Sequence, residues 1–167
     1  ALCSYFAEVA EAVAEEGRPD QALLSLLLNS IYALDRLNKP PALVKAAFEL
    51  RLLCVAGYEP LLDVCALCGE EAPAQPRLDL GEGVLCCAAC GERGSASRPL
   101  DAVSLAAMRH VVYGDPKRLF SFSMNGESMA LMARACEDFL LTQLDRGFRT
   151  LDFYKQLDMG EKGRWPS

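Results

Sequence analysis

Four cysteines in two closely spaced pairs constrain this chain more than any other feature of its sequence. The first pair is Cys65 and Cys68, and the second pair is Cys87 and Cys90, with 18 residues between the pairs. Each pair has C-x2-C spacing, which lets two thiolates on one tight turn bind the same ion. This spacing within and between the pairs is typical of four-cysteine zinc sites.

The four thiolates predict a structural metal rather than a catalytic one. They fill the tetrahedral coordination of zinc and leave no open position for water or substrate. A glycine follows each pair (Gly69 and Gly91), and its freedom to adopt a positive φ lets backbone N–H groups turn towards the sulfurs. Disulfides and free thiols are the alternatives, but disulfide frameworks belong mostly to shorter secreted chains with a poorer core. We expect one structural zinc ion.

The third ligand is ambiguous because Cys86 and Cys87 are adjacent. Cys87 gives C-x2-C spacing with Cys90, whereas Cys86 gives the looser C-x3-C. Neighbouring side chains on an extended segment point to opposite sides, so only one of the two should reach the metal. We predict Cys87 as the ligand, with Cys86 as its alternative and otherwise a spare thiol.

The pattern of apolar residues predicts an all-α helical bundle with an inserted four-cysteine zinc knuckle. Residues 1–61 form the first part of the bundle, 62–99 the insert, 100–157 the second part, and 158–167 a loose tail. Apolar residues recur at three- and four-residue steps in six segments. These are residues 2–13, 20–34, 41–55, 101–113, 127–144 and the short 150–157.

The insert differs from the bundle in residue composition and in the pattern of its apolar residues. Gly, Pro, Ala and acidic residues replace the apolar period, and only residues 77–80 and 84–86 resemble strands. A segment so poor in periodic apolar residues is expected to take its folding energy from metal binding rather than from burial.

Charge argues against nucleic-acid binding through the overall field of this chain. The 167 residues carry a net charge of −6, with an isoelectric point near 4.9, the wrong sign for a phosphate backbone. Arg109, Lys117 and Arg118 come nearest to a basic patch. The chain also starts at Ala1 inside a helical period, as expected for a piece of a longer protein whose other part carries the binding chemistry.

The sequence predicts no enzyme. Its only histidine, His110, lies on a predicted helix, where a structural or exposed role is usual. There is no nucleophile elbow, phosphate-binding loop, dinucleotide fingerprint or H-E-x-x-H motif.

The remaining cysteines and the apolar segments predict a cytoplasmic protein. Cys3, Cys54 and Cys136 stand singly in apolar periods and are expected in the core. Reduced thiols beside a zinc site are typical of the cytoplasm. No signal peptide is evident, and no apolar run is long enough to span a membrane.

Three stretches in order resemble the C-terminal part of the RecO family, the recombination mediators of the bacterial RecF repair pathway. The first is residues 46–53 (AAFELRLL) followed by 56–60 (AGYEP), similar to the central helix of the family and its exit. The cysteine pairs come second. The usual pattern of the family at the second pair is G-x-x-C-x-x-C, and this chain has one residue more between Gly83 and Cys87. The third is residues 139–144 with 149–154 (RTLDFY), similar to the closing helix and ending.

The resemblance implies a DNA repair and recombination mediator that binds single- and double-stranded DNA and anneals strands. With RecR, such a protein helps to load RecA onto strands coated by single-strand-binding protein, in the bacterial cytoplasm at the nucleoid. Family members begin with an OB-fold of roughly eighty residues, which has no counterpart in this chain. Most DNA affinity is therefore expected from that domain.

The resemblance also implies that the acidic tail of single-strand-binding protein docks on the helical domain. A tail that ends in phenylalanine needs an apolar pocket with Lys or Arg at its rim. We predict Lys45 and Arg51 as the partner-binding cations, with ordinary solvated positions on an amphipathic helix as the alternative. A zinc-stapled interaction or regulatory module unrelated to repair is the competing function.

Overall fold

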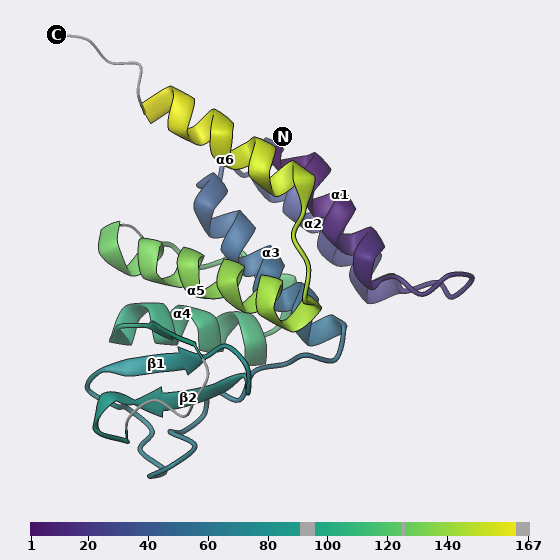
Figure 1. Cartoon of the computed structure of the whole chain (residues 1–167). Coiled ribbons are helices and arrows are strands. Elements are labelled where there is room, and N and C mark those ends of the chain that lie inside the picture. Colours follow the sequence, from purple (N-terminus) through teal and green to yellow (C-terminus); the bar gives the residue numbers. More distant parts are fainter. Residues whose placement is uncertain (91–95, 125, 163–167) are drawn as a thin grey trace, which may run out of the picture.

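The computed structural model describes residues 1–90, 96–124 and 126–162, which form six α-helices and a small three-stranded sheet (Figure 1). The helices and strands in chain order are α1 (Leu2–Val13), α2 (Gln21–Asp35), α3 (Pro41–Val55), β1 (Pro76–Asp79), β2 (Val84–Cys87), β3 (Ser97–Pro99), α4 (Ala102–Tyr113), α5 (Gly126–Leu144) and α6 (Arg149–Lys162). Figure 1 shows α1, α2 and α6 at one end of the molecule and the sheet at the other. None of the helices within the described ranges is both long and apolar enough to cross a bilayer.

Helix α3 is the centre of the bundle and is buried on almost all sides. It packs against α1, α2, α4 and α5, which explains why its apolar residues surround the helix instead of forming one stripe. Proline at the first helical position starts it. It ends in a Schellman motif, in which Gly57 (φ +92°) and Tyr58 donate to the carbonyl oxygens of Cys54 and Leu53.

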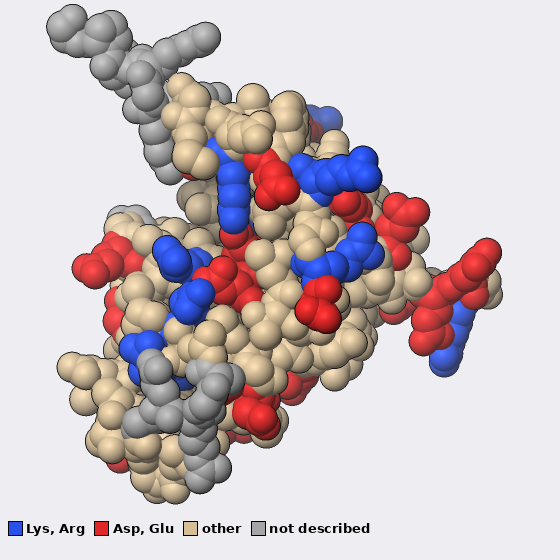
Figure 2. All heavy atoms as spheres, in the orientation of Figure 1, with Lys and Arg blue, Asp and Glu red and all other residues tan. Residues whose placement is uncertain are grey.

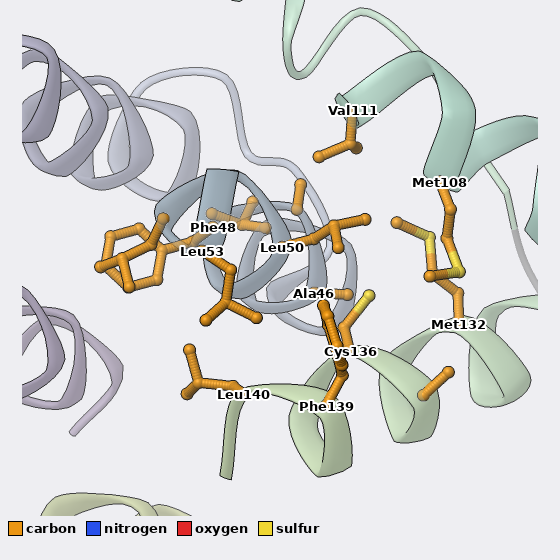
Figure 3. Close-up of a cluster of buried hydrophobic side chains, with 14 of the residues drawn as sticks. Ala46, Phe48, Leu50, Leu53, Met108, Val111, Met132, Cys136, Phe139 and Leu140 are labelled. Carbon is orange, nitrogen blue, oxygen red and sulfur yellow. The ribbon is translucent and has the colours of Figure 1, made fainter. Parts of the chain in front are cut away.

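The core side chains of α3, α4 and α5 interdigitate where these helices meet (Figure 3). On the other side of α3, Phe48 stacks on Phe6 of α1 with ring centroids 4.1 Å apart. The residues labelled in Figure 3 are Ala46, Phe48, Leu50 and Leu53 of α3, Met108 and Val111 of α4, and Met132, Cys136, Phe139 and Leu140 of α5; all belong to one core cluster.

The sheet has the order β2-β1-β3, and both strand pairs are antiparallel. Leu78 of β1 lies opposite Leu85 of β2, and both are fully buried in the core that the helices share. At the turn between these strands, Gly83 has φ +65°, and a Cβ there would lie 3.2 Å from the ring of Phe139 on α5. The sheet is therefore packed directly on the bundle.

The prediction of an all-α bundle needs correction, because the described residues also include the sheet. β1 and β2 lie close to the two predicted strand-like segments, but β3 was not predicted. The expectation that burial contributes little to folding of the insert was also wrong, because apolar residues of the insert join the core of the helices. Four of its leucines (Leu62, Leu78, Leu80 and Leu85) are buried, but they are too widely spaced in the sequence to give an apolar period.

Helix α6 is longer than the apolar pattern predicts. It continues through residues 158–162, which we expected to be loose; residues 163–167 of the predicted tail lie outside the described part of the chain. Glu8 of α1 caps the first turn of α6 by accepting hydrogen bonds from the backbone N–H (3.1 Å) and hydroxyl of Thr150. The two residues lie 142 positions apart in the sequence, so no local pattern predicts their contact.

Candidate metal centre

The first cysteine pair lies on a tight turn that its own backbone closes. The N–H of Gly69 donates to the carbonyl of Cys65 (2.9 Å), and the N–H of Cys65 donates to the carbonyl of Glu70 (2.8 Å). Gly69 has φ +76°, a conformation that side chains other than glycine's rarely adopt. The sequence-based expectation for this glycine is therefore confirmed.

The second pair follows directly from strand β2. Cys87 is the last residue of the strand, and residues Ala88–Cys90 form one turn of 3-10 helix. The N–H of Ala66 in the first turn donates to the carbonyl of Leu85 in β2 (2.8 Å), which holds the two cysteine turns side by side. Gly91, the second glycine that we expected to shape the site, lies outside the described residues.

The sulfur atoms of Cys65, Cys68, Cys87 and Cys90 all lie within 4.8 Å of one another. Two of the separations, Cys65 to Cys90 and Cys68 to Cys87, are 3.8 Å, and Cys87 to Cys90 is 3.3 Å. Zn–S bonds of about 2.3 Å in a regular tetrahedron put the sulfurs about 3.8 Å apart. The four cysteines could thus hold one metal ion.

Cys87 and Cys86 take different positions, as the alternation of a strand requires. Cys87 contributes its sulfur to the cluster, whereas Cys86 does not belong to it. Cys86 lies opposite Arg77 of β1 and is buried. The geometry favours Cys87 as the third ligand and leaves Cys86 as a buried thiol beside the centre.

The electrostatics of the cluster suit a cation. Burial raises the pKa of Cys65, but the backbone N–H groups of Cys68, Leu67 and Cys87 outweigh it and lower that pKa to about 6. The neighbouring thiols of Cys87 and Cys68 raise the pKa of Cys90. Four thiolates repel one another at this distance, so a bound cation is needed to ionise all of them.

Helix α4 clamps the first cysteine turn through two residues whose role was not predicted. Arg109 donates to the carbonyl oxygens of Leu62 (2.8 Å), Asp63 (2.9 Å) and Glu71 (2.6 Å). The hydroxyl of Tyr113 accepts from the N–H of Leu62 at 2.8 Å. The sequence predicts Arg109 as part of a sparse basic surface. The sequence shows an arginine on a helix but not the distant carbonyls that it satisfies.

The two predicted partner-binding cations have internal partners in the structure. The ammonium of Lys45 is buried, 2.7 Å from Glu49 and 2.6 Å from Glu137. Arg51 donates to the carbonyl oxygens of Val112 (3.1 Å) and Val111 (3.4 Å) at the end of α4. The alternative that these are ordinary solvated positions is therefore wrong for Lys45, since α3 is surrounded by other helices.

The ion pair of Lys45 belongs to a network that joins four helices. Tyr5 of α1 donates to Glu49 (2.7 Å), and Lys155 of α6 pairs with Glu137 of α5. Burial opposes the charge on Lys45, but Glu49 and Glu137 outweigh it and raise its pKa. Burial also opposes the charge on Glu137, but Lys45 and Lys155 lower its pKa on balance. The network keeps Lys45 and Glu137 ionised inside the bundle.

The remaining thiols and the histidine do not form a second site among the described residues. Cys136 is buried as predicted and Cys54 is partly buried, but Cys3 is exposed, contrary to expectation. Burial raises the pKa of Cys54 to about 12, so this thiol is inert. His110 Nε2 lies 2.9 Å from the carbonyl oxygen of Arg118, and its ring meets the edge of Phe122, which is a structural arrangement.

A basic pocket lies between the end of α2 and the segment after α4. Its volume is about 420 Å³, and apolar side chains (Tyr32, Leu37, Leu119 and Phe120) line it together with three cations, Lys39, Lys117 and Arg118. Across the part of the chain that the structure describes, no carboxylate pairs with these three. On the face shown in Figure 2, by contrast, Lys and Arg alternate with Asp and Glu and no large patch of one sign appears.

Comparison with known proteins decides the family. The family model described as "Recombination protein O C terminal" matches residues 1–152. The chain belongs to this family. The RecO resemblance of three separate stretches is thereby confirmed for almost the whole chain.

Curated relatives carry the same name. The proteins called "DNA repair protein RecO" from Acetivibrio thermocellus and Symbiobacterium thermophilum are 25% and 29% identical over 93% and 94% of this chain. The one from Anaeromyxobacter sp. (strain K) is 39% identical over 65% of this chain and 42% of its own length. The chain spans 62% and 63% of the first two RecO relatives.

Proposed function

We propose that this chain is the helical, metal-stapled part of a DNA repair and recombination mediator. Its role with RecR would be to help load RecA onto DNA coated by single-strand-binding protein, in the bacterial cytoplasm at the nucleoid. The match to the RecO family over residues 1–152 is the observation that carries this proposal. A non-catalytic role agrees with the single histidine, which has a structural environment.

We propose zinc as the ion of the four-cysteine centre, bound by Cys65, Cys68, Cys87 and Cys90. Sulfur separations near 3.8 Å support it, as does the all-thiolate donor set, which leaves no position for substrate. Such an ion would fix the two cysteine turns against each other. Its contribution is structural, and it would supply no chemistry to a reaction.

The acidic tail of single-strand-binding protein fits the basic pocket better than it fits Lys45 and Arg51. A tail bound by Lys45 would have to compete with Glu49 and Glu137, both within 2.7 Å of its ammonium. The basic pocket instead combines an apolar lining with Lys39, Lys117 and Arg118. Cations at a rim around an apolar floor suit a peptide that carries carboxylates beside a terminal phenylalanine. Lys45 and Arg51 would then act on tail binding only through the fold.

Peptide binding tests the docking site. Fluorescence anisotropy with a labelled acidic peptide that ends in phenylalanine should show binding. Changing both Lys117→Glu and Arg118→Glu should weaken it at least about tenfold. Arg134→Glu is the matched control, because Arg134 is an exposed cation on α5, away from the pocket. Equal loss in the control, or no loss in the double variant, would count against the pocket.

DNA binding by these residues should be weak and sensitive to salt. The net charge is −6, and counterion release needs clustered cations. The mediator role itself is tested in a bacterial strain that lacks its own RecO, by restoring resistance to ultraviolet light with the gene that encodes this chain. Failure of a well-expressed gene product to restore resistance would leave the family membership intact but remove the proposed function.

A further inference from the structure

Helix α2 exposes an apolar stripe that no other part of the described chain covers. Leu24, Leu28 and Tyr32 are each 55–57% exposed and recur every four residues, so they form one continuous ridge. The exposed neighbours on the same face, Gln21, Ser25 and Asn29, are uncharged. A surface helix normally carries charges on this side, and their absence between Asp20 and Asp35 points to a contact surface.

The two ends of the stripe carry opposite charge. Four exposed acidic side chains, Glu11, Glu15, Glu16 and Asp20, lie at the start of α2, and only Arg18 offsets them by pairing with Glu15. The other end carries Arg36, which pairs with Asp35 at 2.9 Å, and the three cations of the basic pocket, Lys39, Lys117 and Arg118. A surface with one acidic end and one basic end is complementary to its own copy turned around.

We propose that α2 is a self-association surface that pairs antiparallel with α2 of a second copy. Leu28 is the middle residue of the helix Gln21–Asp35, so a two-fold axis there sets Leu28 against Leu28 of the second copy. Leu24 then meets Tyr32 of the second copy, and Asp20 faces its Arg36. Packing between ridges of residues four apart is the commonest class of helix–helix packing. A two-fold contact of this kind is closed and self-complementary.

Self-association would also mask the basic pocket. Tyr32 belongs both to the stripe and to the pocket lining, and the acidic end of the second copy would lie against Lys39, Lys117 and Arg118. This part of the inference rests on the proposed docking of an acidic tail in the pocket. The second copy and the tail would compete for the same cations, so free protein would hold its docking site closed until a tail displaces the second copy.

Sedimentation equilibrium tests the surface directly. The chain should form a dimer as its concentration rises from micromolar to submillimolar. Leu28→Glu should weaken the dimer at least about tenfold, because it places two carboxylates at the centre of the contact. Val103→Glu is the matched control, since Val103 on α4 is 54% exposed and lies away from the stripe. A chain that stays monomeric, or equal weakening by both substitutions, overturns the proposal.

Charge exchange tests the antiparallel direction. Glu16→Lys and Lys39→Glu should each weaken the dimer, and the two together in one chain should restore it. Additive weakening in the doubly changed chain overturns the antiparallel arrangement.

Competition by the acidic, phenylalanine-ended peptide separates the two proposals. The peptide should dissociate the dimer and should bind the monomeric Leu28→Glu variant more tightly than the parent chain. A dimer that is unaffected by a peptide bound to the Leu28→Glu variant overturns the masking. No binding to that variant overturns the docking site instead, while the sedimentation result still decides self-association.

Discussion

Arg109 on α4 donates a hydrogen bond of 2.6 Å to the carbonyl oxygen of Glu71, just beyond the first cysteine pair. The same guanidinium reaches the carbonyls of Leu62 and Asp63, so one helical side chain ties both ends of the cysteine turn to the bundle. The metal centre is thus held from two sides, by its own ligands and by α4.

Arg109→Ala should loosen the metal centre without removing a ligand. Three carbonyl groups lose a charged donor, and such hydrogen bonds contribute about 1.5–3 kcal/mol each at most. We expect about 1–3 kcal/mol less free energy of unfolding and faster release of the metal to a chelator. Urea denaturation and a colorimetric chelator assay measure the two effects. Arg134→Ala, which removes an exposed arginine on α5, should change neither by more than a few tenths of a kcal/mol.

Cys87→Ser and Cys86→Ser should separate the ligand from its neighbour. Only Cys87 places its sulfur in the cluster, so its loss should lower the metal content of the purified protein and destabilise the cysteine turns. Cys86→Ser should keep the metal, although burial of a hydroxyl in place of a thiol costs some stability. Metal analysis of the two variants decides between them. Retention by Cys87→Ser with loss by Cys86→Ser would reverse the assignment.

Lys45→Met should be among the most destabilising single changes in this chain. It leaves Glu49, which is fully buried, without its cation, and breaking a buried ion pair by removing one partner costs about 3–5 kcal/mol. Adding Glu49→Leu should recover much of the loss, because the orphaned carboxylate disappears. Urea denaturation of both variants provides the test, and a double variant no more stable than the single one would contradict it.

Glu137 should contribute a pH-dependent part of the stability. Its pKa in the folded chain is lowered, through Lys45 and Lys155, below its usual 4.5. A lowered folded pKa means that the stability is present above the unfolded value and is lost as the pH falls through the folded pKa. Thermal unfolding between pH 7 and pH 3 should therefore show a smaller acid-induced loss in Glu137→Gln than in the parent chain. An unchanged slope would exclude this role.

Helices were predictable from the sequence wherever the information is local. The apolar period located all six, and the boundaries of α3 agreed with its proline start and glycine exit. The four clustered cysteines were predictable too, because C-x2-C spacing encodes a tight turn by itself.

Contacts between distant residues could not be predicted. Strand β3 forms through its pairing with β1. Its residues Ser97 and Arg98 show no alternation of apolar and polar residues that would predict a strand. Arg109 and Glu8 look like surface residues in the sequence, yet they satisfy backbone groups tens of residues away. The burial of Lys45 was not predictable for the same reason, since one of its two carboxylate partners, Glu137, comes from another helix.

X-ray absorption at the zinc edge, combined with metal analysis of protein purified without chelators, tests the central claim most directly. The account predicts one zinc per chain with four sulfur neighbours at about 2.3 Å and no oxygen or nitrogen in the first shell. Substantially less than one zinc per chain, or a shell that mixes sulfur with lighter ligands, would contradict a structural four-cysteine centre.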